Sequence, residues 1–414
     1  MRAARVAAPM GPLSADGSKG VSGIVYATAK GSNVVDVDGN RYVDLAAGFG
    51  AMLLGHGHPA VSRVIELEGE RLLQALGDVH PSDAKIALLE RLSALLPEGD
   101  AKVILGQSGG DAVTAAIKTA VLATGRPGIL AFRGGYHGLS YAPLAASTLR
   151  ESYRDPFAPQ LNPHVAVAEY PKDSESASRT LEDVRTRLAS GDIGAVVVEP
   201  VLGRGGIVIP PPGFLSDLSR VATEHGALLV ADEIWTGLGR SGAMLASLED
   251  GIVPDVVCLG KGLGGGLPVS ACIGKDSVMR AWRREAEVVH TSTFAGAPLA
   301  CAAAIATFDT LSRERLVERS RDLGQRWLER LRSAVQSTPA VTAVRGRGLM
   351  IGLDLGARAG AATKLQAALL EHGYIASTGG GSRETLVLTP PLTVAESLLF
   401  EFADALPVAL RALG

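Results

Sequence analysis

The segment 255–270, DVVCLGKGLGGGLPVS, constrains the chain most, because in it an apolar run ends at a lysine that lies between glycines. The run 256–259 is too short for a typical helix, contains β-branched residues and is bounded by Gly260, so it predicts a buried strand. A lysine in a partly apolar environment can lose its proton near neutral pH, and its neutral amine can then form a Schiff base with an aldehyde. Most lysines near strand ends are solvated, so a reactive Lys261 requires further parts of a site.

The segment 101–125 offers a place for a phosphate group. A short β-rich run at 103–105 leads into the sequence Gly-Gln-Ser-Gly-Gly, after which Asp111 opens an alanine-rich helix. A strand, a glycine-rich turn and a helix N-terminus can bind phosphate through free backbone N–H groups and the helix dipole. An ordinary turn before a capped helix has the same pattern, and the segment matches neither a Walker A loop nor the dinucleotide-binding fingerprint.

Further polar and aromatic side chains are expected at strand ends. Tyr136 and His137 lie between glycines in the strand-and-turn segment 128–140, and Tyr136 offers a flat face suited to stacking on a heteroaromatic ring. Glu199 and Asp232 each end an apolar run, where an acid is costly without a partner. In open α/β sheets the carboxyl ends of the strands form the ligand crevice, so both acids and the lysine are expected there.

Composition excludes several kinds of partner and compartment. The 40 basic and 43 acidic residues give a net charge of −3 without a basic stripe, so neither nucleic acid nor a membrane is an expected partner. No run of about 18 apolar residues predicts a membrane-spanning helix, and the N-terminus lacks the apolar core of a secretion signal. Cys258, Cys272 and Cys301 lie in apolar surroundings, which favours buried thiols and a cytoplasmic location. No metal is expected at the site.

Apolar periodicity predicts how the 414 residues are organised. Helices are expected at 60–76 and 82–96, the second capped by Ser82, and a short helix near 276–284. The Asp-Gly pair within 34–45 predicts a hairpin. Residues 1–22 show no periodicity, 141–175 is expected to be a long polar connection, and one long helix is expected from about 300 to about 335.

A chain of this length is expected to form at least two lobes. Runs of helices with a few strands after about residue 300 predict a smaller α+β lobe. We divide the chain into an N-terminal segment 1–50 that packs with the small lobe, a large domain 51–300 and a small domain 301–414.

Six motifs follow one another in a characteristic order: SGG (108–110), YHG (136–138), VEPVLGRGG (198–206), DEIWTGLGRSG (232–242), LGKGLGGGLP (259–268) and STFAGAPLA (292–300). In this order they resemble the class III, or omega-type, aminotransferases, which are pyridoxal-phosphate enzymes of fold type I. The resemblance covers nearly the whole chain and is more specific for the family than for the substrate. It implies an α/β fold, with a mostly parallel seven-stranded sheet flanked by helices in the large domain and a smaller α+β domain.

The resemblance also implies roles for individual residues. Lys261 is expected to form the Schiff base with pyridoxal 5′-phosphate and to shuttle a proton, while Asp232 pairs with the pyridine N–H so that the ring acts as an electron sink. Tyr136 is expected to stack on the ring. The other expected cofactor contacts are His137 and Glu199 beside the ring, Ile234 on its other face, Ser108, Gly109 and Gly110 at the phosphate, and Thr293 at the phosphate of the neighbouring subunit. A homodimer with shared active sites follows from the last contact.

Several positions depart from the family pattern. Arg204 stands where relatives that act on α-carboxylates often carry glutamate, and Val387 stands where they often carry arginine. Arg204 either binds a substrate carboxylate or pairs with a local acid. Trp235, Gly110 and Ala297 also replace a common glutamine, hydroxyl residue and asparagine. A pocket shaped by Phe49, Met52, Arg204 and Trp235 is expected to take a non-standard substrate, such as a bulky amine or an amino sugar.

We therefore expect a ping-pong transamination between a small amine donor and an oxo acid or aldehyde acceptor. A racemase, an aminomutase or a decarboxylating transaminase would need the same lysine and acid, so the residues leave these alternatives open. A binding protein on a retired enzyme scaffold is disfavoured, because both Lys261 and Asp232 are present.

Overall fold

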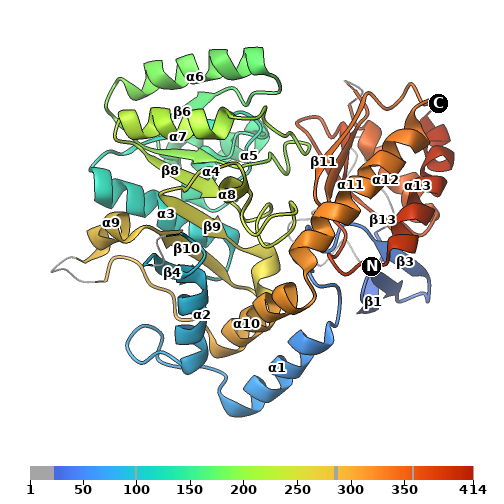
Figure 1. Cartoon of the computed structure of the whole chain (residues 1–414), viewed down its shortest axis with the longest axis horizontal. Coiled ribbons are helices and arrows are strands. Elements are labelled where there is room, and N and C mark those ends of the chain that lie inside the picture. Colours follow the sequence, from blue (N-terminus) through green and yellow to red (C-terminus); the bar gives the residue numbers. More distant parts are fainter. Residues whose placement is uncertain (1–22, 98–99, 284–287, 357–358, 414) are drawn as a thin grey trace.

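A computed structural model describes residues 23–97, 100–283, 288–356 and 359–413 (Figure 1). The irregular segment expected at 1–22 lies outside the described residues. Figure 1 shows a larger body built on one sheet, at left, and a smaller body of C-terminal elements, at right.

Seven strands form the central sheet of the larger body. Their order is β4 (Lys102–Gly106), β10 (Ser270–Gly274), β9 (Val256–Leu259), β8 (Leu228–Asp232), β7 (Ile193–Val198), β5 (Gly128–Phe132) and β6 (Val165–Ala168). β10 is antiparallel to both of its neighbours, and the other adjacent pairs are parallel. The expected mostly parallel, seven-stranded sheet is confirmed.

Alternate side chains of these strands face opposite helical layers, as the two-residue period of a strand requires. In β5, Ile129 and Ala131 pack in one cluster with α3 (Gly109–Thr124). Leu130 and Phe132 of the same strand pack with α6 (Ser174–Leu188) and α7 (Phe214–Glu224). Because both faces are covered, all six residues of β7 are buried, and the middle strands read as continuous apolar runs.

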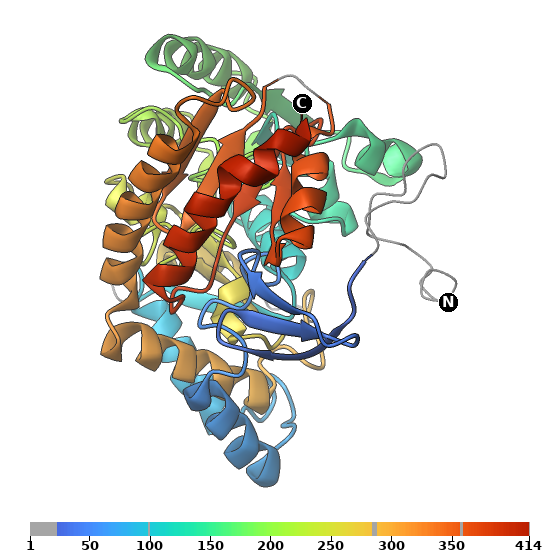
Figure 2. The same cartoon turned by 90° about the vertical axis from the view of Figure 1, so that its right-hand side faces the viewer.

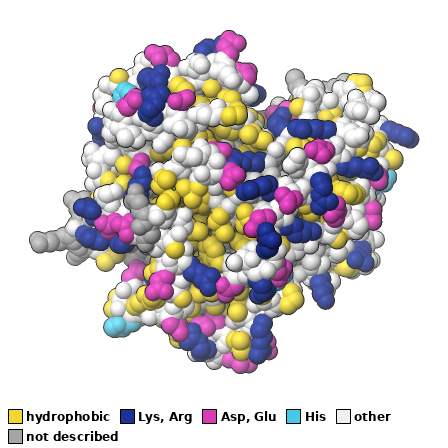
Figure 3. Space-filling view, viewed as in Figure 1, with side chains coloured by type: hydrophobic (Ala, Val, Ile, Leu, Met, Phe, Trp, Pro, Cys, Tyr) yellow, Lys and Arg dark blue, Asp and Glu magenta, His cyan; other side chains and the backbone are white. Residues whose placement is uncertain are grey.

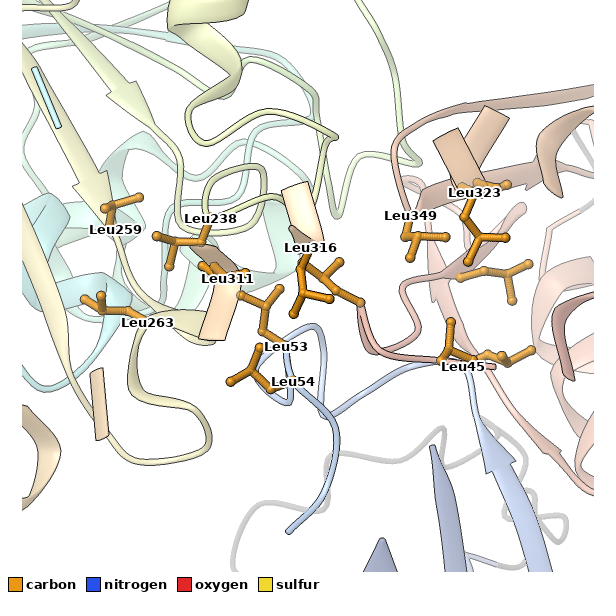
Figure 4. Packing of buried hydrophobic residues seen from close by; sticks show 14 of the residues in the cluster. Leu45, Leu53, Leu54, Leu238, Leu259, Leu263, Leu311, Leu316, Leu323 and Leu349 are labelled. Carbon is orange, nitrogen blue, oxygen red and sulfur yellow. The ribbon is translucent and has the colours of Figure 1, made fainter. Parts of the chain in front are cut away.

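A third apolar cluster joins the sheet to the C-terminal elements. It contains side chains of β9 and β10, of α2 (Asp83–Ser93), α10 (Pro298–Arg313) and α11 (Leu316–Val335). Figure 4 shows its labelled leucines extending from Leu259 and Leu263, near the sheet, to Leu323 and Leu349 in the C-terminal elements. α1 (Pro59–Arg71) packs against α10 at the outer end of this cluster. The two bodies therefore share one hydrophobic core.

The C-terminal body carries an antiparallel sheet covered by helices. The sheet order is β11 (Ala343–Arg347), β12 (Met350–Asp354), β15 (Thr385–Leu388) and β14 (Ser377–Gly379), and the helices are α11, α12 (Ala361–Glu371) and α13 (Glu396–Leu410). The expected hairpin forms from β2 (Asn33–Asp36) and β3 (Arg41–Asp44), extended by β1 (Tyr26–Lys30) and by β13 (Tyr374–Ile375). Figure 2 shows these blue N-terminal strands beside the red C-terminal elements. The domain boundaries 1–50, 51–300 and 301–414 stay predictions.

Three expected elements differ in the structure. The single helix expected at 300–335 is two helices, because Arg315 has a φ of 49° and its left-handed backbone ends the first helix. The connection 141–175 is not irregular throughout; it contains α4 (Tyr141–Ala146), α5 (Glu151–Arg154), a 3₁₀ turn and β6. The helix expected at 276–284 is shorter, α9 (Asp276–Met279) followed by a 3₁₀ turn.

Within the part of the chain that the structure describes, no helix is long and apolar enough to cross a membrane, and no group of three or more potential metal-binding side chains occurs. On the face shown in Figure 3, Lys and Arg side chains are interspersed with Asp and Glu side chains.

Ser82 is the N-cap of α2, and its contribution to stability can be tested. Ser82 is buried, and its Oγ accepts a hydrogen bond from Lys85 N at 3.1 Å, as its position before the helix predicts. Ser82→Ala should lower the free energy of unfolding by about 1 kcal/mol, because it leaves a helix N–H group without its acceptor. Urea denaturation measures this loss. The control is Ser178→Ala at an exposed position within α6, which should be neutral or slightly stabilising. Equal losses in both variants would contradict the capping role.

Candidate active site

Glu199, Asp232 and Lys261 lie at one edge of the central sheet. The register pairs Val198 with Ala231 and Asp232 with Cys258, so the ends of β7, β8 and β9 are adjacent. Lys261 lies two positions after the end of β9. Its φ of 45° is in the left-handed region, which residues with a side chain rarely adopt. Strained backbone of this kind concentrates at functional sites, where the surroundings hold it in place.

The Lys261 amine lies in an apolar environment. Its Nζ is 4.6 Å from the centre of the Trp235 ring, and it makes no hydrogen bond or ion pair with the residues that the structure describes. Burial lowers the pKa of Lys261 to about 8, although the negative charges of Asp232 and Glu199 oppose this shift, and the positive charge of Arg204 adds to it. A substantial fraction of the amine is therefore neutral near physiological pH and available as a nucleophile or base.

Asp232 is held by His137 in the interior. His137 Nδ1 donates to Asp232 Oδ2 at 2.7 Å, and Asp232 Oδ1 accepts from Ile234 N at 3.1 Å. The two side chains are only 1% and 4% exposed. Burial opposes a charged imidazole, but the hydrogen bond and the charge of Asp232 exceed that effect, so the pKa of His137 is raised overall. The imidazole and the carboxylate are therefore joined in one buried, hydrogen-bonded pair.

Glu199 joins two of the loops around the cavity. Its Oε1 accepts from Tyr136 N and its Oε2 accepts from Gly203 N, both at 2.9 Å. Burial raises the pKa of Glu199 to about 7, with the charge of Asp232 adding to the rise and that of His137 opposing it. Its protonation state is therefore sensitive to the charges brought in by a ligand.

The N-terminus of α3 lies where the sequence predicts a phosphate cradle. Ser108 caps this helix, and its Oγ and the Asp111 carboxylate exchange hydrogen bonds with each other's backbone N–H groups. The N–H groups of Gly109 and Gly110, in the first turn, have no intrahelical acceptor. A Cβ atom at Gly110 would lie 2.9 Å from Ser140 Oγ, and one at Gly109 would lie 2.9 Å from Ile234 Cδ1. Glycine at both positions keeps the backbone accessible to an anion.

These groups surround one cavity of about 340 Å³. Its lining contains eleven of the predicted site residues: Ser108, Gly109, Gly110, Tyr136, His137, Glu199, Arg204, Asp232, Ile234, Trp235 and Lys261. A larger cavity of about 760 Å³ lies elsewhere, beside Lys85 and Ser292. The smaller one is the candidate site, because it alone of the two holds the lysine and the strand-end acids.

Sequence reasoning missed three lining residues: Gly138, Leu139 and Ser140. They follow Tyr136 and His137 directly in the sequence. Ser140 was the available signal, but its position near Gly110 arises only when the chain is folded. Three predicted residues lie outside the lining. Phe49 is 47% exposed and contacts the cavity through Arg204, and Met52 packs near Gly48 and Gly266.

The third of these residues, Thr293, lies on the outer surface. Its backbone oxygen accepts from Gln74 Nε2 at 2.8 Å, and the neighbouring Ser292 bonds to Gln107 at 2.5 Å. Thr293 is exposed and does not reach the cavity of its own chain.

The sheet with a lysine and an acid at the carboxyl ends of its strands, beside an anion cradle and a flat aromatic side chain, is typical of a fold type I pyridoxal-phosphate enzyme. The family model of the class-III aminotransferases matches residues 14–410, and the chain belongs to this family. The protein is accordingly an aminotransferase, and its cofactor is pyridoxal phosphate.

Sequence relatives cover nearly the whole chain. An acetylornithine aminotransferase from Methanopyrus kandleri is 36% identical over 391 residues, which are 94% of this chain and 95% of the relative. A 4-aminobutyrate aminotransferase from Mycobacterium leprae is 32% identical over 415 residues, covering 94% and 91%.

Solved structures agree with the fold. A PLP-bound amine transaminase from an uncultivated Pseudomonas species superposes with a TM-score of 0.91 at 28% identity, covering 99% of both chains. An ornithine aminotransferase from Toxoplasma gondii gives a TM-score of 0.83 at 27% identity, covering 94% of this chain and 90% of that one. The expected family, fold and cofactor are confirmed.

The hydrogen bond to Asp232 should govern the titration of His137. In Asp232→Asn the carboxylate charge is lost while burial, which favours the neutral imidazole, remains, so the pKa of His137 should fall. NMR titration of histidine-labelled protein measures the shift, with His137→Gln identifying the signal. Asp250→Asn, which removes a carboxylate paired with Arg347, serves as the control; a His137 pKa that moves equally in both variants, or in neither, would contradict the assignment.

Proposed function

We propose that pyridoxal phosphate binds in the 340 Å³ cavity with Lys261 as its covalent attachment point. The residues present fit this group. Backbone N–H groups at Gly109 and Gly110 suit its phosphate, Tyr136 and Ile234 suit the two faces of its ring, and Asp232 suits its ring nitrogen. When bound, pyridoxal phosphate supplies an aldehyde that takes up an amino group and a ring that withdraws electrons from the reacting carbon.

The protein side chains then supply proton transfer and orientation. The Lys261 amine, with its lowered pKa, takes a proton from the substrate carbon and returns it. Asp232 would accept the hydrogen bond of a protonated ring nitrogen, and the imidazole of His137 holds the Asp232 side chain in place. Glu199 fixes the loops that carry Tyr136 and Gly203. The single observation that carries the proposal is an amine without an ion-pair partner among the described residues, in one small cavity with the buried Asp232–His137 pair.

The reaction we propose is a ping-pong transfer of an amino group from a small amine donor to an oxo acid or aldehyde. The names of the relatives, acetylornithine, 4-aminobutyrate and amine transaminases, support this class of reaction. A bulky amine or an amino sugar as substrate stays a prediction that none of these names supports. We also propose a cytoplasmic location, which the three free and buried cysteines support.

We further propose a homodimer in which Thr293 reaches the phosphate of the partner's cofactor. Thr293 lies outside the cavity of its own chain, on a surface with large exposed apolar side chains. These side chains, each more than half exposed, are Leu73, Leu76, Val79, Val288, Val289 and Phe294. The 760 Å³ cavity lies beside them. Apolar surface of this kind marks an interaction site, and a second copy of the chain is the occupant that would use Thr293.

Loss of Lys261 should remove both the attachment of the cofactor and the proton transfer. Lys261→Ala should lose turnover by at least about 100-fold, because proton transfer by a positioned side chain contributes about 10²–10⁴-fold. Borohydride reduction of the holoenzyme should place the pyridoxyl group on the Lys261 peptide, as detected by mass spectrometry. Lys364→Ala on exposed α12 is the control and should resemble the wild type. Retained turnover in Lys261→Ala, or label on another lysine, would refute the assignment.

Sharing of the site between subunits can be tested by complementation. Thr293→Asp places a negative charge beside the phosphate, so its homodimer should bind the cofactor about tenfold or more weakly. At a limiting cofactor concentration, coexpression with Lys261→Ala should restore activity, because the mixed dimer contains one site with an intact lysine and an intact threonine. If Thr293 acted within its own chain, no site in the mixed dimer would be intact, and activity at limiting cofactor would stay as low as in the Thr293→Asp homodimer.

A further inference from the structure

Arg204 lies on a loop that is fixed from both sides. Within this loop Leu202 and Val208 form a backbone bridge, and Gly203 N donates to Glu199. The Arg204 carbonyl accepts from Gly380 N at 2.8 Å, which ties the loop to the C-terminal body. The backbone of Arg204 is therefore held in place beside the cavity before any substrate binds.

Two aromatic rings hold the Arg204 side chain. Its Cζ atom is 5.1 Å from the centre of the Tyr136 ring and 5.7 Å from that of Phe49. These contacts attract the charge but provide no oxygen acceptor for the five N–H donors of the guanidinium. The side chain makes no hydrogen bond or ion pair with the described residues, and its Nε is enclosed without a partner.

Two other partly buried arginines, Arg345 and Arg347, do have an acidic partner. Arg345 pairs with Asp354 at 2.6 Å, and Arg347 pairs with Asp250 at 2.8 Å. The acid nearest in the loop, Glu199, already accepts two backbone N–H groups. Of the two roles expected for Arg204, pairing with a local acid is therefore absent from the described residues. A guanidinium left without an anion in a partly desolvated place favours an anionic ligand.

Val387, at the position where relatives that act on α-carboxylates often carry an arginine, offers no such group. Val387 of β15 is 1% exposed and packs with Trp235, Val201, Ile207 and Met350 in an apolar cluster. Trp235 fills this side tightly, because a Cβ atom at Gly203 would lie 2.4 Å from its ring. Of the cations that line the cavity, His137 is paired with Asp232 and Lys261 is assigned to the cofactor. Arg204 is the remaining one.

We propose that Arg204 binds the carboxylate of the oxo acid acceptor, and of the amino acid formed from it, while the remainder of that substrate faces Trp235. This inference rests on the proposed transamination and names the substrate class that the same site selects. The aromatic contacts preorganise the guanidinium, so that binding the carboxylate orders few further side-chain rotamers. The resulting specificity depends on the loop after β7 and not on the β15 wall.

The test compares an oxo acid with its neutral amide, pyruvate with pyruvamide, at a saturating concentration of an amine donor that the enzyme accepts. The wild type should prefer the acid in kcat/KM. Arg204→Gln should raise KM for pyruvate by about 10- to 100-fold, the range for a hydrogen bond to a charged group, with a smaller change in kcat. In this variant the ratio of kcat/KM for pyruvate to kcat/KM for pyruvamide should fall toward one. Arg204→Lys, which keeps the charge without the planar fork, should be intermediate.

The matched control is Arg150→Gln. Arg150 also contacts a tyrosine ring, at 5.8 Å from Tyr153, and donates to the backbone near Gly380, but it does not line the cavity. Arg150→Gln removes the same charge as Arg204→Gln. It should leave the ratio of kcat/KM for pyruvate to that for pyruvamide as in the wild type. A wild type without preference for the acid, or equal increases in KM for both substrates in Arg204→Gln, would overturn the inference. A wild type that transfers no amino group from any amine to any carbonyl acceptor would instead refute the proposed function.

Discussion

The hydrogen bond between Asp232 and His137 is the interaction on which the active site depends. Asp232 ends a strand whose residues are almost entirely buried, and a carboxylate there would be expensive without a cationic partner. His137 provides that partner from the neighbouring loop and gains a raised pKa from the contact. Asp232 is therefore held by a hydrogen bond at the buried edge of the sheet, in the lining of the cavity that contains Lys261.

Burial shifts the pKa values of two other ionisable groups of the cavity in opposite directions. It lowers the pKa of Lys261, which makes a neutral amine available, and it raises the pKa of Glu199. Because these groups share one small space, a change of charge on one alters the others. Glu199 adds a mechanical connection, since its two oxygens hold the loop of Tyr136 and the loop that carries Arg204. The loop of Tyr136 and the loop of Arg204 are thereby held by the same carboxylate.

Features that depend on a few consecutive residues could be predicted from the sequence, whereas contacts between distant segments could not. The strands β7, β8 and β9 were predictable because each is a short apolar run with a charged residue at or just after its end, and Ser82 was predictable because capping involves three consecutive residues. The break at Arg315 was not, since no glycine or proline interrupts the helical pattern there. Ser140 was missed because its proximity to Gly110 arises between segments about thirty residues apart.

The sequence by itself determined the family and the order of the elements, and it singled out the lysine and acids of the candidate site, because these depend on local patterning and on motifs read along the chain. Only the tertiary structure decided which charges are paired. Asp232 meets His137 across 95 positions, Glu199 meets Tyr136 across 63, and Arg204 meets two rings but no carboxylate among the described residues. Such pairings are set by how strands and loops pack over a shared core, and the free energy of a buried charge depends on what surrounds it in space.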